Sequence, residues 1–205
     1  MSLTNLYGDV ELAPQAMRAL AHPVRLAILS RLQRHGPSTA SRLSPEVGAT
    51  PSVTSWHLRH LATFGLVRDA EQGNDARERW WEAVGRGFRF VAPDDPDDLE
   101  GQAAYRALTQ QMFLQSDELP RRWLADVEEH LPPRWRRLSG LSNTRVVVGP
   151  AELAALERSI EELLAPYVRR NPEEAPRGSR SVRLMRYVMP EAVEQTGRST
   201  RQGRP

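Results

Sequence analysis

Residues 50–61, TPSVTSWHLRHL, follow a pattern that fits a short helix with two unlike faces. Thr54, Leu58 and Leu61 recur at i, i+4 and i+7, the spacing that lays one face of a helix on an apolar core. The other face carries hydroxyl groups, an arginine and a tryptophan, which are side chains that contact DNA grooves and phosphates. Such a helix needs a small core beneath it, so the neighbouring segments must supply one.

The neighbouring segments place this helix in a defined order of elements. Pro23 suits a first helical position, Thr50 is expected to cap the helix at 51–64, and Gly65 ends it. Adjacent residues of a strand point to opposite faces, so one of Trp80 and Trp81 should face the core. The sequence predicts helices over residues 11–20, 23–35, 39–48 and 51–64, then strands over residues 67–71 and 77–83 around a turn at 72–75. That order is helix, turn, helix and wing.

Charge is distributed unevenly along the chain, although the formal net charge is only +2. All 28 basic residues are arginine, whose planar guanidinium suits phosphates and guanine edges. Residues 18–68 carry seven arginines against one acid, Glu46, whereas residues 94–100 carry five acids and no base. A basic stripe beside an acidic segment is the pattern that a local nucleic-acid footprint produces.

Several other classes of protein are disfavoured by the composition. The chain has no cysteine, so disulfides and thiolate metal sites are excluded. It has no phosphate-binding glycine loop, no metal-ligand spacing and no nucleophile signature, so we expect neither an enzyme nor a cofactor. No apolar run reaches the roughly 18–20 residues of a membrane span, and no signal peptide is recognisable, so we expect a cytoplasmic protein without membrane contact.

Three segments in order carry a resemblance to a known family. They are ALAHPVRLAIL at 19–29, SVTSWHLRHL at 52–61 and FGLV at 64–67. Together they resemble the ArsR/SmtB-like winged helix-turn-helix transcriptional regulators, over about residues 11–85. The resemblance implies a homodimer that binds a palindromic operator, usually as a repressor, with the second helix of the motif in the major groove.

The chain departs from that family in two ways. Founding members sense metals through Cys, or through His and acidic ligands, and this chain has no Cys. Its only closely spaced histidines, His57 and His60, fall on the DNA-reading helix, so we expect a member that does not sense metals. The second departure is a long C-terminal extension.

The resemblance also assigns candidate DNA contacts by position. Arg59 is expected to hold a phosphate or a guanine edge. Trp56 has two alternatives: it contacts a thymine methyl or a sugar, or it packs on a neighbouring helix. His57 and Arg25 are expected to be structural. The candidate DNA-binding residues are Thr50, Ser52, Ser55, Trp56, Arg59, Arg77 and Arg79.

The whole chain is predicted to be mainly α with small β elements, combining an N-terminal winged helix-turn-helix domain with a C-terminal α+β helical domain. The expected order is a flexible arm at 1–10, the DNA-binding domain at 11–90, an acidic linker at 91–98, a dimerisation or effector domain at 99–190 and a disordered tail at 191–205. Within 99–190 we expect helices over 99–115, from Pro120 to about 131, and over 150–167, with strands over 144–148 and 181–189.

The C-terminal part raises two further expectations. Its apolar stripe of Leu153, Leu156, Ile160, Leu163 and Tyr167 predicts either an internal core or a dimer seam. Its aromatic and Met side chains define a candidate pocket for a small apolar ligand that would lower operator affinity: Tyr105, Met112, Phe113, Trp123 and Trp135. The sequence thus predicts a dimeric, DNA-binding repressor of transcription. The alternative is a winged-helix module that sequesters another regulator without binding DNA.

Overall fold

The structure, a computed structural model, describes residues 6–70, 78–168, 170 and 172–192. The contacts divide the chain into two compact units, residues 1–169 and 170–205, and each is treated by itself. The predicted turn at 72–75 and the candidate residue Arg77 lie outside the described residues, as do parts of the predicted arm and tail.

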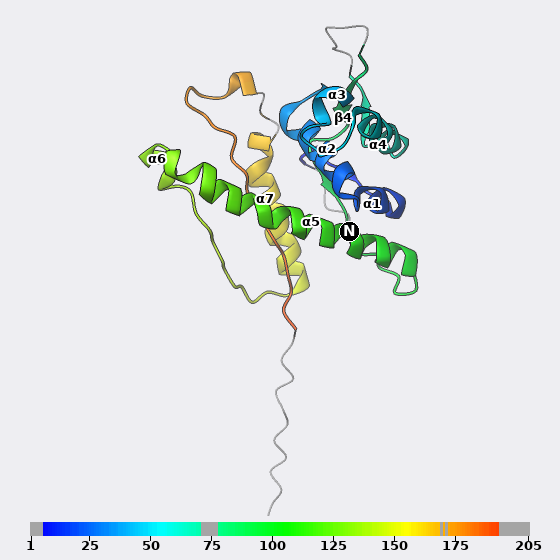
Figure 1. Ribbon diagram of the computed structural model, residues 1–205. Helices are drawn as coiled ribbons and strands as arrows, with labels where there is room; N and C mark the ends of the chain where they lie inside the picture. Colours follow the sequence, from blue (N-terminus) through cyan, green and yellow to red (C-terminus); the bar gives the residue numbers. More distant parts are fainter. Residues whose placement is uncertain (1–5, 71–77, 169, 171, 193–205) are drawn as a thin grey trace, which may run out of the picture. The chain divides into compact units, whose positions relative to one another are not determined.

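The N-terminal part of the first unit has the predicted order of helices and wing (Figure 1). The elements are β1 (Val10–Glu11), α1 (Pro14–Leu20), α2 (Pro23–His35), β2 (Ser38–Thr39), α3 (Ala40–Leu43), α4 (Pro51–Thr63), β3 (Val67–Asp69), β4 (Trp80–Ala83) and β5 (Phe88–Arg89). A three-stranded antiparallel sheet has the order β2-β4-β3, and a separate parallel pair joins β1 to β5.

Side-chain caps fix the beginnings of the two long helices of this part, α2 and α4. The Nδ1 atom of His22 accepts a hydrogen bond of 3.2 Å from the backbone N–H of Val24. The Oγ1 atom of Thr50 accepts one of 3.4 Å from the N–H of Val53, which confirms the predicted cap. After α4 the chain turns at Gly65, whose φ of 66° lies in the left-handed region that glycine adopts without strain.

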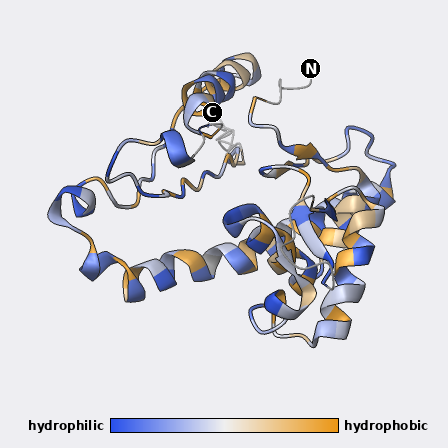
Figure 2. Ribbon diagram, turned by 90° about the horizontal axis from the view of Figure 1, so that it is seen from above, coloured by the Kyte–Doolittle hydropathy of each residue, from blue (hydrophilic) through white to orange (hydrophobic). Residues whose placement is uncertain are grey.

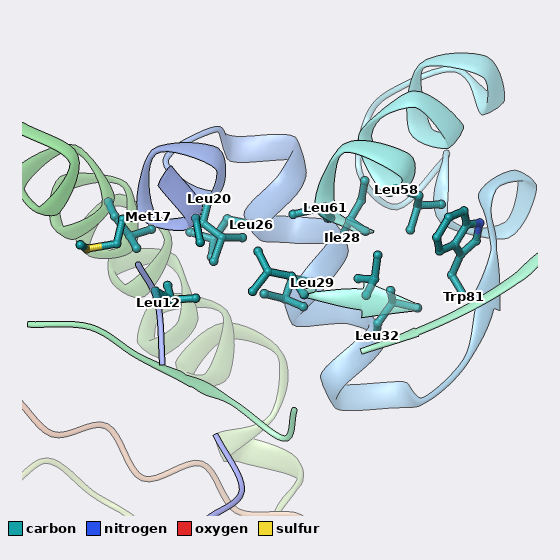
Figure 3. Packing of buried hydrophobic residues seen from close by; sticks show 14 of the residues in the cluster. Leu12, Met17, Leu20, Leu26, Ile28, Leu29, Leu32, Leu58, Leu61 and Trp81 are labelled. Carbon is teal, nitrogen blue, oxygen red and sulfur yellow. The ribbon is translucent and has the colours of Figure 1, made fainter. Parts of the chain in front are cut away.

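One apolar core joins the helices of this part to the sheet. Figure 3 shows Leu58 of α4 close to Ile28 of α2 and Trp81 of β4, all three of them buried. Trp80, on the opposite face of β4, is only partly buried, so the prediction that one of the two tryptophans faces the core is confirmed. This core holds α4 by its apolar side and leaves its polar side outward.

A single long helix follows the acidic segment. We predicted two helices, one ending at 115 and a second beginning at Pro120, and this is wrong: α5 (Leu99–Asp126) runs through the proline. A proline removes one backbone hydrogen bond, and the bonds of the turns on either side of it maintain this helix. At its start α5 packs beside α1, and its residues Ala104 and Leu108 are buried in the same core as Leu58. No helix among the described residues is both long and apolar enough to cross a membrane.

The rest of the described chain is helical or irregular. It contains η1 (Glu128–His130), α6 (Pro133–Arg136), α7 (Pro150–Val168) and η2 (Pro172–Glu174). The fold class is therefore confirmed as mainly helical with a winged helix-turn-helix domain. The two C-terminal strands predicted at 144–148 and 181–189 are wrong, because both segments are irregular and exposed. Alternating sequence favours a strand, but a strand also needs a neighbour to pair with.

The apolar stripe of α7 does not form an internal core in the described chain. Leu156 and Tyr167 are exposed, and Leu163 is 69% exposed. Figure 2 shows apolar and polar residues interspersed along the helices of the chain. Of the two alternatives raised for this stripe, the internal core is therefore wrong.

The polar side of α7, by contrast, makes an ionic contact with the winged helix. The guanidinium of Arg89 on β5 forms ion pairs with Glu161 of α7 and with Asp9, the latter at 3.3 Å. The ring of Tyr7 lies 5.4 Å from the same guanidinium. The side chain of Glu161 is only 4% exposed, so this carboxylate depends on Arg89 for compensation of its charge.

Candidate nucleic-acid interface

The face of α4 that points away from the core carries most of the predicted contacts. The core side of the helix consists of Thr54, His57, Leu58 and Leu61, all of them buried. Diametrically opposite, at i, i+4, i+7 and i+11, lie four exposed side chains: Ser52, Trp56, Arg59 and Thr63. Ser55 lies at the edge of this face and is partly buried. The helix thus presents hydroxyls, one guanidinium and one indole together.

A cavity of about 520 Å³ opens between α3, α4 and the wing. Its walls bring four of the predicted residues together: Ser52, Ser55, Arg59 and Arg79. Its remaining lining residues are Thr39, Ala40, Ser41, Pro51, Glu78 and Trp81. Hydroxyls and guanidinium groups around one hollow can donate hydrogen bonds to the phosphate oxygens of a nucleic acid.

Arg79 is held firmly at one wall of this cavity. Its Nε and Nη2 atoms donate to the two carboxylate oxygens of Asp69 at 2.5 and 2.9 Å, and its guanidinium lies 4.2 Å from the centroid of the Trp81 ring. The hydrogen bonds from Arg79 lower the pKa of Asp69, which therefore stays ionised. Arg79 is thus preoriented, but Asp69 offsets its charge locally.

Arg59 and Arg42 extend the guanidinium surface along the helices. The Nη1 atom of Arg59 donates to the Oγ atom of Ser55 at 3.3 Å, which lays the side chain along the exposed side of α4. Arg42 of α3, absent from the predicted set, lies with its guanidinium 4.7 Å from the centroid of the Trp80 ring. The sequence signal that would have identified Arg42 is its place beside Leu43. Leu43 is the buried residue of α3, and the adjacent Arg42 is exposed.

A cluster of imidazoles lies beneath the tryptophan of α4. The ring of His57 is buried and lies 4.8 Å from the ring of His22 and 4.9 Å from that of Trp56. Arg25 donates from Nε to the carbonyl oxygen of Ala19, so both it and His57 have structural contacts, as predicted. Among the described residues no group of three potential metal ligands is arranged to hold an ion.

The environment of His57 disfavours its charged form. Burial lowers the pKa of His57, and the nearby His22, Arg25 and His60 lower it further. Burial and Arg25 likewise lower the pKa of His22 and of His60. The cluster is therefore neutral at neutral pH, and protonation would place like charges side by side.

We expect this cluster to make the protein less stable in acid. Below the ordinary histidine pKa of 6.5 the unfolded chain binds protons that the folded chain does not. The free energy of unfolding therefore decreases as the pH drops below 6.5, whereas above 6.5 these groups have no effect on it. Urea denaturation at about pH 7.5 and about pH 5.5 measures the difference. His57→Gln, which removes one titrating group, should show a smaller difference. Equal differences in the two proteins would contradict this assignment.

The five residues of the candidate ligand pocket occupy different surroundings. Tyr105 and Met112 pack at the margin of the winged-helix core, where Tyr105 lies 5.7 Å from the ring of Phe90. Phe113 is exposed, while Trp123 and Trp135 are partly buried further along the chain on α5 and α6. The pocket stays a prediction.

Two solved structures are similar to parts of this chain at low sequence identity. A structure of a MarR family regulator from Neisseria meningitidis is 19% identical, with 70% of this chain and 79% of that chain covered and a TM-score of 0.30. The YusO protein from Bacillus subtilis is 14% identical, with 71% and 84% covered and a TM-score of 0.31.

Sequence comparisons are more specific. The family model of the helix-turn-helix domain matches residues 20–70, which span α2 to β3 and include the whole exposed face of α4. The HTH-type transcriptional regulator YgaV of Escherichia coli (strain K12) is 34% identical over 73 residues, which are 34% of this chain and 74% of that protein. The identity of 34% extends over most of that relative, and the helix-turn-helix domain covers the helices of the candidate interface. The chain therefore belongs to the HTH-type transcriptional regulators.

Proposed function

We propose that the protein is a dimeric repressor of the ArsR/SmtB-like type that binds a palindromic operator through α4. The observation that carries the proposal is the exposed face of α4, which combines hydroxyls with Arg59 opposite a buried inner face. The proposed contacts are Thr50, Ser52, Ser55, Trp56, Arg59 and Arg79, together with Arg77 from outside the described residues.

The chemistry of this face suits double-stranded DNA. Ser52 and Ser55 donate to phosphate oxygens or base edges, and Arg59 reaches either a phosphate or the O6 and N7 atoms of guanine. Arg79 at the wing adds a preoriented guanidinium beside the same cavity. The winged-helix sequestration module, our alternative, would need none of these groups at this surface.

The exposed stripe of α7 supports a dimer. Burying a helical row of leucine side chains in an interface lowers the free energy by about 25 cal/mol per Å² of apolar area removed from water. A second copy of the chain, related by a twofold axis, would cover this row and place two α4 helices on two half-sites. A small apolar ligand of the C-terminal part would then alter the spacing of those helices and release the operator.

A salt-dependent mobility-shift assay tests the proposal. The protein is incubated with its own promoter region and with duplexes recovered from a random-sequence pool, at several salt concentrations. Counterion release makes the affinity fall steeply as salt rises if the guanidinium groups contact phosphates. Absence of binding to every duplex, or a flat salt dependence, would favour the sequestration module instead.

Replacing Arg59 with alanine is expected to weaken operator binding by about 1–3 kcal/mol if it reads a guanine. Loss at a single base position would identify a base contact, whereas a uniform loss across sequences with a shallower salt slope would identify a phosphate contact. The matched control is Arg122→Ala, which removes an equal charge from an exposed ion pair on α5. If the two variants bind equally well, Arg59 is not part of the interface.

A further inference from the structure

Trp56 is the large apolar residue on the otherwise polar outer face of α4. It is 52% exposed, so a large apolar area of this residue remains in contact with water. It lies on the outermost stripe of the helix, between Ser52 and Arg59. A half-exposed indole at the centre of the proposed DNA-contacting face is accessible to the DNA.

The indole is held in place by rings of its own helix. The ring of His60 is stacked on that of Trp56, with centroids 5.4 Å apart and an interplanar angle of 4°. His60 in turn meets the edge of Phe64 at 5.2 Å, and His57 meets Trp56 edge-on at 4.9 Å. The residues at 56, 60 and 64 thus form a ladder along one side of α4 and its C-terminal cap.

This arrangement favours one of the two alternatives for Trp56. The ring contacts described above come from α4 itself and not from a neighbouring helix. The indole is oriented before any DNA arrives, so little side-chain entropy is lost when it binds. Its preorientation and its exposure together favour recognition over packing.

We infer that Trp56 reads the 5-methyl group of a thymine in the major groove, and that His60 positions its ring for this contact. The inference rests on the proposed function. The thymine methyl is the one apolar group that a base pair displays in the major groove, and a flat apolar side chain meets it directly. The polar ends of the neighbouring Ser52 and Arg59 are suited instead to the hydrogen-bonding groups of bases and phosphates.

Deoxyuridine provides a direct test, because it differs from thymidine only by the missing methyl. A duplex recovered by selection from a random-sequence pool is resynthesised with each thymidine replaced in turn. Wild-type protein should bind about fourfold more weakly when one particular thymine in a half-site loses its methyl, the effect of exposing one methyl-sized apolar group. Trp56→Ala should bind both duplexes equally, measured at low salt, where phosphate contacts are strongest.

The role of His60 is tested through the ratio of the affinities for the thymidine duplex and the deoxyuridine duplex. His60→Ala should reduce the preference for thymidine over deoxyuridine while leaving affinity for the deoxyuridine duplex unchanged. His60→Phe, which restores a ring at this position, should recover the preference. A role of His60 in stability alone would change both affinities together.

The outcomes separate this inference from the proposed function. If no duplex is bound, the proposed function fails and the inference fails with it. If DNA is bound but no thymine shows a methyl effect, or if the effect persists in Trp56→Ala, only the inference is overturned. Thermal unfolding of each variant establishes that it is folded before binding is compared.

Discussion

Leu58→Ala is expected to lower the free energy of unfolding by about 2–5 kcal/mol, the range for deleting a buried leucine and leaving a cavity. Leu58 is fully buried, at 0% exposure, where α4 meets α2 and the core tryptophan of β4. Because rigid neighbours surround it, the cavity cannot easily collapse. Urea denaturation followed by circular dichroism measures the change.

The matched control comes from the same helix. Val53, 46% exposed, lies outside the core, so Val53→Ala should change the free energy of unfolding by at most about 0.5 kcal/mol. A loss in Val53→Ala as large as that in Leu58→Ala would mean that α4 is not packed on its Leu58 side.

Arg89→Ala is expected to cost about 3 kcal/mol of stability, the lower end of the range for removing one partner of a buried ion pair. Arg89 itself is 25% exposed, but its partner Glu161 is almost fully buried and would be left without compensation. Burial alone would lower the pKa of Arg89. The carboxylates of Glu161 and Asp9 have the larger effect, so the pKa of Arg89 is raised. The loss should therefore be accompanied by weaker protection of α7 in hydrogen exchange.

Two further variants identify the cause of that loss. Arg158→Ala removes an exposed arginine from α7 and should leave stability nearly unchanged. Glu161→Gln keeps a side chain of similar shape but removes the buried charge, so it should cost less than Arg89→Ala. If Arg89→Ala behaves like Arg158→Ala, the ion pair does not attach α7 to the winged helix.

The winged helix was predictable because its signals are local. Periodic burial at Thr54, Leu58 and Leu61, a capping threonine and a terminal glycine are all properties of short segments, and each of them appears in the structure. Ser52, Ser55, Arg59 and Arg79 converge on one cavity for the same reason: the helix period and the wing fix their positions.

The remaining features depend on contacts between distant segments. The sequence could not indicate that α5 continues through Pro120, because a proline marks a helix start as readily as an interruption. The segments at 144–148 and 181–189 have strand composition, but composition does not provide a pairing partner. The ladder of Trp56 and His60 depends on side-chain rotamers, which spacing alone leaves open.

The burial of Ala104 and Leu108 beside α1 determines where the chain can be divided. A fragment ending at the acidic segment of residues 91–98 would expose the apolar surface of α1 that α5 covers, and it should aggregate or unfold at lower temperature. The smallest fragment that folds therefore has to include the first turns of α5, to about Met112. It follows that gene fusions or domain exchanges made at the acidic segment would separate α4 from part of its own support. Exchanges made beyond Met112 would keep α4 together with the part of α5 that belongs to the same core.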